Sequence, residues 1–409
     1  MSSSAVIVRH GRGVVLATNA EVRERSVRRR VGLAWGLLVL NAMGYTGLVV
    51  PVPSAVGKLI TQGALPLAVL IALTVNRRLV VRPNVFLFLV SLLAAGAVVT
   101  CMPPQYFGTA YRTVRLAEFV AVLWLLTPWW GRRDMLLLRC HLKSIVVILV
   151  SVVLGIFIAP GKALGTGRLA GALWAIPATQ VAHYAAVAFG VTVVLWLCGQ
   201  LRGRVTLAIL GAALAILLLT HTRTALVAMV AGLLVSGLSL LVARARVRRL
   251  FAIAGAMTAV AVMTLSTVLT TWLARGEGTQ QLTNLTGRTK VWFPLLNFPR
   301  TRFQEIFGFG LSNDSFNGLP IDSNWLASYL DQGLFGVVVC AAILVFLLVL
   351  AYFQPRGLQR ALALFFITYC LVASFTEVGF TGASPYLLEL TLAASLLTPF
   401  TRSPAHVVG

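Results

Sequence analysis

Apolar stretches of close to twenty residues recur along almost the whole chain. We place them near residues 33–50, 59–75, 84–101, 113–130, 143–160, 180–198, 205–221, 224–242, 250–272, 333–353, 361–376 and 383–399. About twenty apolar residues let a helix cross the hydrocarbon core of a bilayer, and only a helix or a closed barrel satisfies its backbone hydrogen bonds there. The pattern therefore predicts an all-α, polytopic membrane protein with about twelve transmembrane helices.

Composition supports the same fold class. The chain has 409 residues, of which 58% are hydrophobic and only 11% are charged, and its mean hydropathy is +0.89. A soluble domain carries roughly a quarter charged residues, so this chain could not cover its surface with polar groups in water. The five cysteines fall in or beside spans, without metal-ligand spacing, and we expect no metal or cofactor.

The net charge of +23 is distributed as a topology signal. Alternate loops are rich in Lys and Arg, which marks the cytoplasmic side of a membrane protein. We therefore expect both termini in the cytoplasm and no nucleic-acid partner. The predicted organisation is a basic tail (1–32), spans one to nine (33–273), a large extracytoplasmic loop (274–332), spans ten to twelve (333–400) and a short tail (401–409).

Several charged residues lie on the predicted outer side, against the positive-inside tendency. Arg112, Arg115 and Glu118 recur every three residues in "YRTVRLAEF", so a helix places them roughly on one face. Ionisable groups near the hydrocarbon are costly and usually face a polar cavity. They predict an outward-facing site for an anionic substrate; an Arg–Glu pair that anchors the fourth span is the alternative. Glu377 belongs to the same outer side.

Two further basic positions occur in short loops. Arg168 lies in a glycine-rich loop ahead of Pro177, where a solvated arginine is the commoner explanation. His221 and Arg223 interrupt an apolar run of some forty residues, and the alternative there is a tight turn with Thr222 capping the next helix. A cap needs only a hydroxyl group, so Arg223 favours an anion site.

The predicted outer loop carries a third group. Arg288, Lys290 and Trp292 lie in "TGRTKVWF", and aromatic and arginine anchoring at the membrane surface is the competing interpretation. Arginine binds phosphate through two parallel hydrogen bonds. Two or three converging arginines would suit a diphosphate at the head of a lipid.

Asp322 and Asn324 lie where the tenth span begins, after the polar stretch "GFGLSNDSFN". Asp322 or Ser323 as a helix N-cap is one explanation. A carboxylate that accepts a proton from a sugar hydroxyl is the other. We expect Asp322 to be the catalytic residue.

In their order, "GRLAG…P" (167–177), "HTRTALVAMVAGLL" (221–234), "TGRTKVW" (286–292), "GFGLSNDSF" (307–316) and "DSNWLASYLDQGLFG" (322–336) resemble the O-antigen ligase and polysaccharide polymerase superfamily. The resemblance covers roughly residues 105–400. It implies a GT-C-like glycosyltransferase of the bacterial inner membrane. Such an enzyme moves a glycan, without a metal ion, from a polyprenyl (undecaprenyl-type) diphosphate to a hydroxyl acceptor.

The resemblance also assigns residues. It implies that Arg168, Arg223 and Arg288 hold the diphosphate and that a loop side chain activates the acceptor. Ligases typically have His at the head of the last motif, where this chain has Asp322, so a polymerase remains at least as well supported as a ligase. A twelve-span secondary transporter is the main alternative; a glycan-binding scaffold and another lipid-linked glycosyltransferase are the others.

Overall fold

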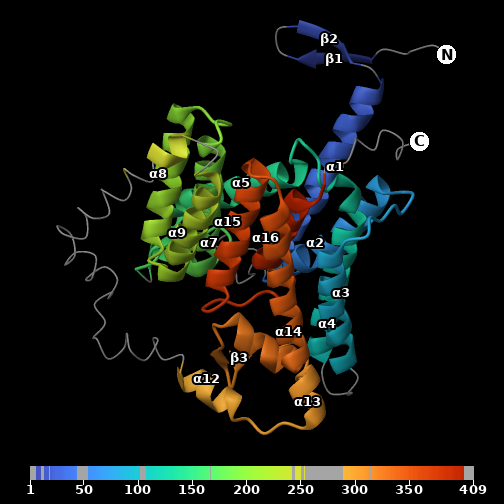
Figure 1. Ribbon diagram of the computed structural model, residues 1–409, viewed down its shortest axis with the longest axis vertical. Helices are drawn as coiled ribbons and strands as arrows, with labels where there is room; N and C mark the ends of the chain where they lie inside the picture. Colours follow the sequence, from blue (N-terminus) through green and yellow to red (C-terminus); the bar gives the residue numbers. More distant parts are fainter. Residues whose placement is uncertain are drawn as a thin grey trace.

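The computed structural model describes residues 6–10, 13–17, 19–43, 54–101, 107–165, 167–241, 245–249, 253, 289–312 and 315–399. Helices dominate these residues (Figure 1). The long helices are α1 (Asn19–Ala42), α2 (Ser54–Val75), α3 (Val85–Thr100), α4 (Phe107–Leu125), α5 (Leu136–Ile158), α7 (Ala178–Leu197), α8 (Gly203–Leu219), α9 (Arg223–Leu240), α14 (Asn324–Phe353), α15 (Leu358–Ala373) and α16 (Pro385–Leu397).

Each predicted span that falls largely within the described residues overlaps one of these helices, and nearly all of the predicted span 250–272 lies outside them. Among the described residues, four helices are long and apolar enough to cross a membrane, namely α5, α7, α9 and α14. Five shorter apolar helices accompany them, among them α3, α8, α15 and α16. The architecture is that of a mostly helical membrane protein, and twelve crossings remain a prediction.

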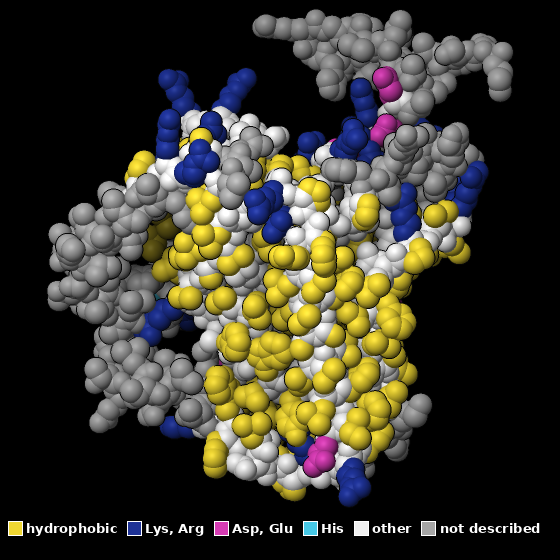
Figure 2. Space-filling view, in the orientation of Figure 1, with side chains coloured by type: hydrophobic (Ala, Val, Ile, Leu, Met, Phe, Trp, Pro, Cys, Tyr) yellow, Lys and Arg dark blue, Asp and Glu magenta, His cyan; other side chains and the backbone are white. Residues whose placement is uncertain are grey.

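The surface carries the apolar side chains that such a protein presents to lipid. Phe157, Leu207 and Val338 are 79%, 72% and 63% exposed. Figure 2 shows hydrophobic side chains across the middle of one face and most of that face's Lys and Arg side chains at the end that carries the chain termini. Soluble monomers rarely expose apolar areas of this extent.

The helices pack as two groups. In one group, α2 contacts α1 and α4, and α3 contacts α4 and α14. In the other, α7 contacts α8, α9 and α15, and α9 also contacts α15. Helix α5 touches both α1 and α7, and α16 packs against α15 and, less extensively, against α14 and α1. Phe365 of α15 fits against Gly190 and Gly232, where a Cβ atom would come within 2.0 and 2.9 Å of its ring. Glycine at these positions lets α7 and α9 approach α15 closely, as small residues do between membrane helices.

Helix α14 is interrupted at Gly333. Gly333 has φ 61° and ψ −157°, a conformation that is not helical. The break frees the carbonyl groups of Leu330 and Asp331, and these accept hydrogen bonds from the backbone N–H groups of Phe309 and Gly310 at 2.9 Å. The predicted boundary between outer loop and tenth span falls at this residue.

The segment ahead of α14 forms a small separate unit at the end opposite the termini (Figure 1). It contains α12 (Thr289–Leu296), α13 (Arg302–Phe307) and a hairpin of β3 (Ser315–Phe316) and β4 (Leu319–Pro320). Val291, Leu295 and Ile321 form a second hydrophobic cluster with Ala327 and Leu330. This cluster fixes the segment onto the first part of α14.

The predicted basic tail (1–32) contains two strands, which an all-α fold does not include, and the first part of α1. Strands β1 (Val6–His10) and β2 (Gly13–Ala17) pair as an antiparallel hairpin, and α1 begins at Asn19. The short α6 (Pro160–Ala163) and a 3-10 helix (Thr127–Trp129) are the remaining named elements.

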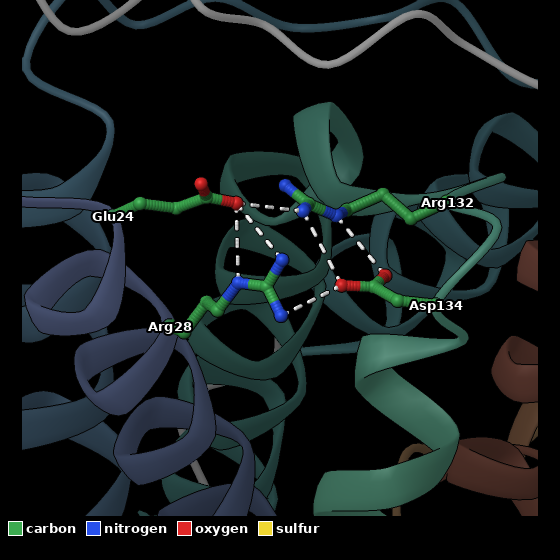
Figure 3. Close-up of polar contacts among 4 residues, drawn as sticks. All are labelled: Glu24, Arg28, Arg132 and Asp134. Carbon is green, nitrogen blue, oxygen red and sulfur yellow. Dashed lines mark hydrogen bonds and ion pairs between the residues drawn. The ribbon is translucent and has the colours of Figure 1, made fainter. Parts of the chain in front are cut away.

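Ion pairs explain why α1 begins so early. Arg28 lies 2.9 Å from Glu24 and 3.1 Å from Asp134, and Arg132 lies 3.2 and 3.1 Å from the same two carboxylates (Figure 3). Hydrogen bonds from Arg28 and Arg132 hold the pKa of the Glu24 carboxyl below its ordinary value. The Glu24–Arg28 pair supports the helix one turn apart, and the other pairs tie α1 to the start of α5.

Candidate functional site

A polar cavity of 410 Å³ lies where several helices meet at one end. Its wall is formed by the end of α1, the first turns of α4 and α7, residues 311–312, and the segment between α15 and α16. Arg112, Arg115, Asp331, Glu377 and His183 line it. These five side chains make it a site for a charged, polar ligand.

Two arginines of α4 are held on the wall by bonds to other elements. The Arg112 Nη1 group donates to the carbonyl oxygen of Leu311 at 3.2 Å. The Arg115 Nε group donates to Oδ1 of Asn41 at 3.0 Å, and Nη2 donates to the Asn41 carbonyl. A guanidinium has five N–H donors in a planar fork, and these bonds orient the two groups on the cavity wall.

A carboxylate lies beside the first arginine. Asp331 is 2% exposed, and its Oδ1 accepts a hydrogen bond from the Ser312 backbone N–H at 3.0 Å. Because Arg112 binds Leu311 and Asp331 binds Ser312, the cation and the carboxylate flank one short piece of chain. The break at Gly333 places Asp331 there, since the freed carbonyl of the same residue binds Gly310.

Helix N-termini add positive potential to the cavity. Pro177, Thr179 and Gln180 at the start of α7 line it, and so do Ser384 and Pro385 at the start of α16. The first backbone N–H groups of a helix lack helical partners, and the helix dipole favours an anion there. Two arginines and two helix starts therefore favour a negatively charged ligand.

One residue that lines the cavity, His183, belongs to a buried acid–base pair. His183 Nε2 of α7 lies 2.7 Å from Glu389 Oε1 of α16, and their side chains are 2% and 0% exposed. The ring of Tyr386 packs 4.5 Å from the imidazole ring, centre to centre. Buried ionisable pairs in membrane segments commonly mark functional sites.

The structure brings two of the predicted diphosphate ligands to one turn. Arg168 donates from Nε to the Thr220 carbonyl and from Nη2 to the Thr222 hydroxyl, both at 3.0 Å. Arg223 is the first residue of α9 in the same turn, where His221 has a φ of 50°. Thr222 is the N-cap residue, but its side chain makes no cap hydrogen bond; it holds Arg168 instead.

This turn reaches the cavity wall indirectly. The Thr224 and Thr376 hydroxyls are 2.8 Å apart, and Thr376 precedes Glu377. Of the described residues, Arg168, Arg223 and Asp322 are not among those that line the cavity. Arg112, Arg115 and Glu377, which the sequence suggested as secondary binding residues, are.

The two predicted residues at the start of α14 lie behind the wall. Asp322 is partly buried with a φ of 45°, and Ser323, not Asp322, occupies the N-cap position without a side-chain cap bond. Asn324 is fully buried, and its Oδ1 accepts the backbone N–H groups of Gly379 and Phe380 at 3.2 and 2.8 Å. Asn324 thereby positions a loop of the cavity.

The predicted residues of the outer segment have mixed outcomes. Arg288 lies outside the described residues. Lys290 is exposed on α12. Trp292 donates its indole N–H to the Ile321 carbonyl at 2.8 Å, so it anchors α12 next to Asp322. Arg300 contacts the Tyr329 ring at 4.0 Å and donates to the Tyr329 carbonyl, which is a structural role.

His183, Glu389 and Asp331 are the residues that sequence reasoning missed as site residues. His183 sits in an apolar helical stretch, where a single histidine gives no signal of its partner 206 positions away; only helix packing joins it to Glu389. Asp331 could have been identified from the sequence, because it is an acidic residue close to a glycine at a predicted span boundary.

Within the described ranges, no three His, Cys, Asp or Glu side chains gather as a metal site requires. No family model matches the chain, and no curated protein is detectably similar to it.

Proposed function

We propose that the protein is a membrane glycosyltransferase that moves a glycan from a polyprenyl diphosphate to a hydroxyl acceptor. The observation that best supports this proposal is the cavity, which is lined by two arginines, two helix N-termini and the carboxylates of Asp331 and Glu377. The order of motifs in the sequence, which resembles the O-antigen ligase and polysaccharide polymerase superfamily, supports the same reaction.

In this proposal Arg112 and Arg115 bind the diphosphate in the cavity, with Arg168 and Arg223 on the flanking turn. Negative charge grows on the diphosphate as the glycosidic bond breaks, and fixed cations stabilise that charge most in the transition state. The diphosphate leaves with the bonding electron pair. The acceptor oxygen forms the new bond at the same carbon, with inversion.

The acceptor hydroxyl must lose a proton in this step. Glu377 is partly exposed on the cavity wall, and we assign it as the proton acceptor. Asp331 already accepts the Ser312 N–H, so we assign it the role of holding residues 311–312 beside Arg112. Asp322, the residue expected from the sequence, is the competing proton acceptor.

The proposal places the cavity on the extracytoplasmic side of a bacterial inner membrane, with twelve spans and both termini in the cytoplasm. Alternating basic loops support this topology. Helices α12 and α13 and the β3–β4 hairpin lie at the end of the bundle opposite the termini (Figure 1), where a glycan on the outer leaflet would be accessible.

The test uses purified protein in liposomes with a polyprenyl-diphosphate oligosaccharide, alone and with candidate hydroxyl acceptors. Consumption of the donor without any ion gradient is expected, with chain growth from donor alone for a polymerase and transfer only to an acceptor for a ligase. Arg112→Gln should lower the rate roughly 100-fold by removing a transition-state cation. An inert wild-type protein with every donor and acceptor pair would contradict the proposal.

Two carboxylate variants decide the proton acceptor. Glu377→Gln should lower the rate by about 100-fold or more. Asp322→Asn should retain activity, since Asn tolerates a positive φ and the group lies outside the cavity lining. The reverse result would assign the role to Asp322. Arg204→Gln, on α8 and away from the cavity, is the control for charge loss.

A secondary transporter is the second candidate, and two observations favour it. Helix α14 is broken at Gly333, and His183 and Glu389 form a buried ionisable pair; transporters use both features. A transporter would accumulate substrate only with a proton or sodium gradient and would leave the donor glycan intact. Glu389→Gln would then abolish the coupling.

A further inference from the structure

A second cavity, which shares only Met43 with the polar one, runs along the surface between α1 and α5 and has a volume of 870 Å³. One wall is the face of α1 from Arg28 to Met43, and the other is the face of α5 from Leu136 to Ser151. Leu173 and Trp174 close the far end. We define this cavity as the α1–α5 groove.

Small side chains explain why the groove exists. Gly32 and Gly36 are one turn apart on α1. A Cβ atom on Gly32 would lie 3.2 Å from the Cys140 sulfur atom, and one on Gly36 would lie 3.7 Å from the Ser144 hydroxyl oxygen. The two helices therefore touch through small groups, and larger residues such as Leu40 and Val147 form the sides of a furrow above them.

The groove is basic at one end and apolar along its length. Arg28, Arg29, Arg139 and Lys143 gather within the first turns of the two helices. Fourteen residues separate Arg29 from Met43, which is about 21 Å along a helix. A single leaflet of a bilayer has hydrocarbon about 15 Å deep, so the groove is long enough for an acyl chain.

The charges at the basic end divide into two kinds. Arg28 is paired with Glu24 and Asp134 (Figure 3), so the nearby carboxylates are occupied. Arg29, Arg139 and Lys143 are exposed, and none of them has a hydrogen bond or ion pair with a described residue. Three cations therefore remain for an anion at the mouth of an apolar furrow.

We propose that the α1–α5 groove binds an anionic phospholipid. Its phosphodiester headgroup lies on Arg29, Arg139 and Lys143, and an acyl chain occupies the furrow over Gly32 and Gly36. Basic pockets between membrane helices select anionic lipids in this way, and each basic residue near the surface strengthens the attraction. A neutral phospholipid fills the furrow but gains nothing from the cations.

The test is native mass spectrometry of the delipidated full-length protein, titrated with dioleoyl phosphatidylglycerol or with dioleoyl phosphatidylcholine. The anionic lipid should bind at least about tenfold more tightly. The triple variant Arg29→Gln/Arg139→Gln/Lys143→Gln should lose this preference. A control that removes three charges elsewhere, Arg204→Gln/Arg248→Gln/Arg249→Gln, should keep it.

A second pair of variants tests the furrow. Gly36→Leu fills it without changing charge and should weaken lipid binding about tenfold, whereas Gly211→Leu, on α8 with open space around its Cβ position, should not. Glycerol phosphate, which has the headgroup and no chain, should not displace the lipid. Equal affinity for both lipids, or an unchanged preference in the triple groove variant, would overturn the proposal.

Discussion

At the residue scale, the turn between α8 and α9 shows how one hydroxyl can serve a tertiary contact instead of a local one. Thr222 occupies the N-cap position of α9, where a Thr side chain usually accepts a backbone N–H. Here its oxygen accepts from Arg168 and donates to the Thr220 carbonyl. The sequence predicted that Thr222 lies at a helix N-cap, but it gave no sign that Arg168 from another loop would bind its hydroxyl.

Removing that hydroxyl should destabilise the protein. Thr222→Val keeps the shape but deprives the Arg168 guanidinium of an acceptor, and we expect a loss of about 1–2 kcal/mol in the free energy of unfolding. Thr222→Ser should recover most of it. Unfolding in mixed detergent micelles measures both, and a valine variant as stable as the wild type would contradict the contact.

The His183–Glu389 pair gives a second residue-scale prediction. His183→Ala leaves a carboxylate buried without its partner and should cost about 3–5 kcal/mol. His183→Leu combined with Glu389→Leu should cost clearly less than the sum of the single changes, because no isolated charge remains. A double-mutant cycle on unfolding measures the coupling, and strictly additive effects would show that the two groups do not interact.

At the element scale, the break in α14 connects the outer segment to the cavity. Gly333 adopts a positive φ that side chains other than hydrogen resist, and a Cβ there would lie 2.5 Å from the Ile306 carbonyl carbon. Gly308 has φ 79°, and a Cβ atom on it would lie 2.4 Å from the backbone of both Asp331 and Gln332. The crossing of α13 over α14 therefore depends on two glycines.

Gly333→Ala should disrupt this crossing. We expect a loss of about 3 kcal/mol or more, because the alanine is strained in this conformation and collides with a backbone. Gly211→Ala in the interior of α8 is the matched control; it meets nothing within 4 Å and should be neutral or stabilising by up to about 1 kcal/mol. Equal stabilities of the two variants would refute the role of the break.

At the scale of the whole molecule, the two ends of the bundle differ in charge and in structure. The end with the termini carries most of the Lys and Arg side chains on the face that Figure 2 shows, and the opposite end carries α12, α13 and the β3–β4 hairpin. This asymmetry agrees with the topology that the basic loops predict.

Cysteine labelling tests the topology directly. In a cysteine-free background, Thr301→Cys should react with a membrane-impermeant maleimide added to intact cells. Arg248→Cys should react only after the membrane is permeabilised. Both positions are exposed, so access to solvent is not the limiting factor. Labelling of Arg248→Cys in intact cells would reverse or abolish the proposed orientation.

The sequence by itself determined the helices and their approximate ends. Apolar runs near twenty residues need a helix in lipid, and this local requirement located α3, α8 and α9 to within two residues at each end. The sequence also singled out arginines on the predicted outer side. Basic residues are rare on that side of a membrane protein, so their presence suggested a function. The three-residue spacing of Arg112 and Arg115 predicted that the two side chains lie on one face of a helix.

Only the tertiary structure decided which charges share a cavity. His183 of α7 and Glu389 of α16 meet only in the folded bundle, and Asp331 comes to the cavity wall beside Ser312 because α14 breaks at Gly333. Asp322 and Asn324 are two residues apart, yet one is partly exposed and the other is fully buried behind a loop. Such placements arise from contacts between helices far apart in the chain, and periodicity along one helix carries no information about them.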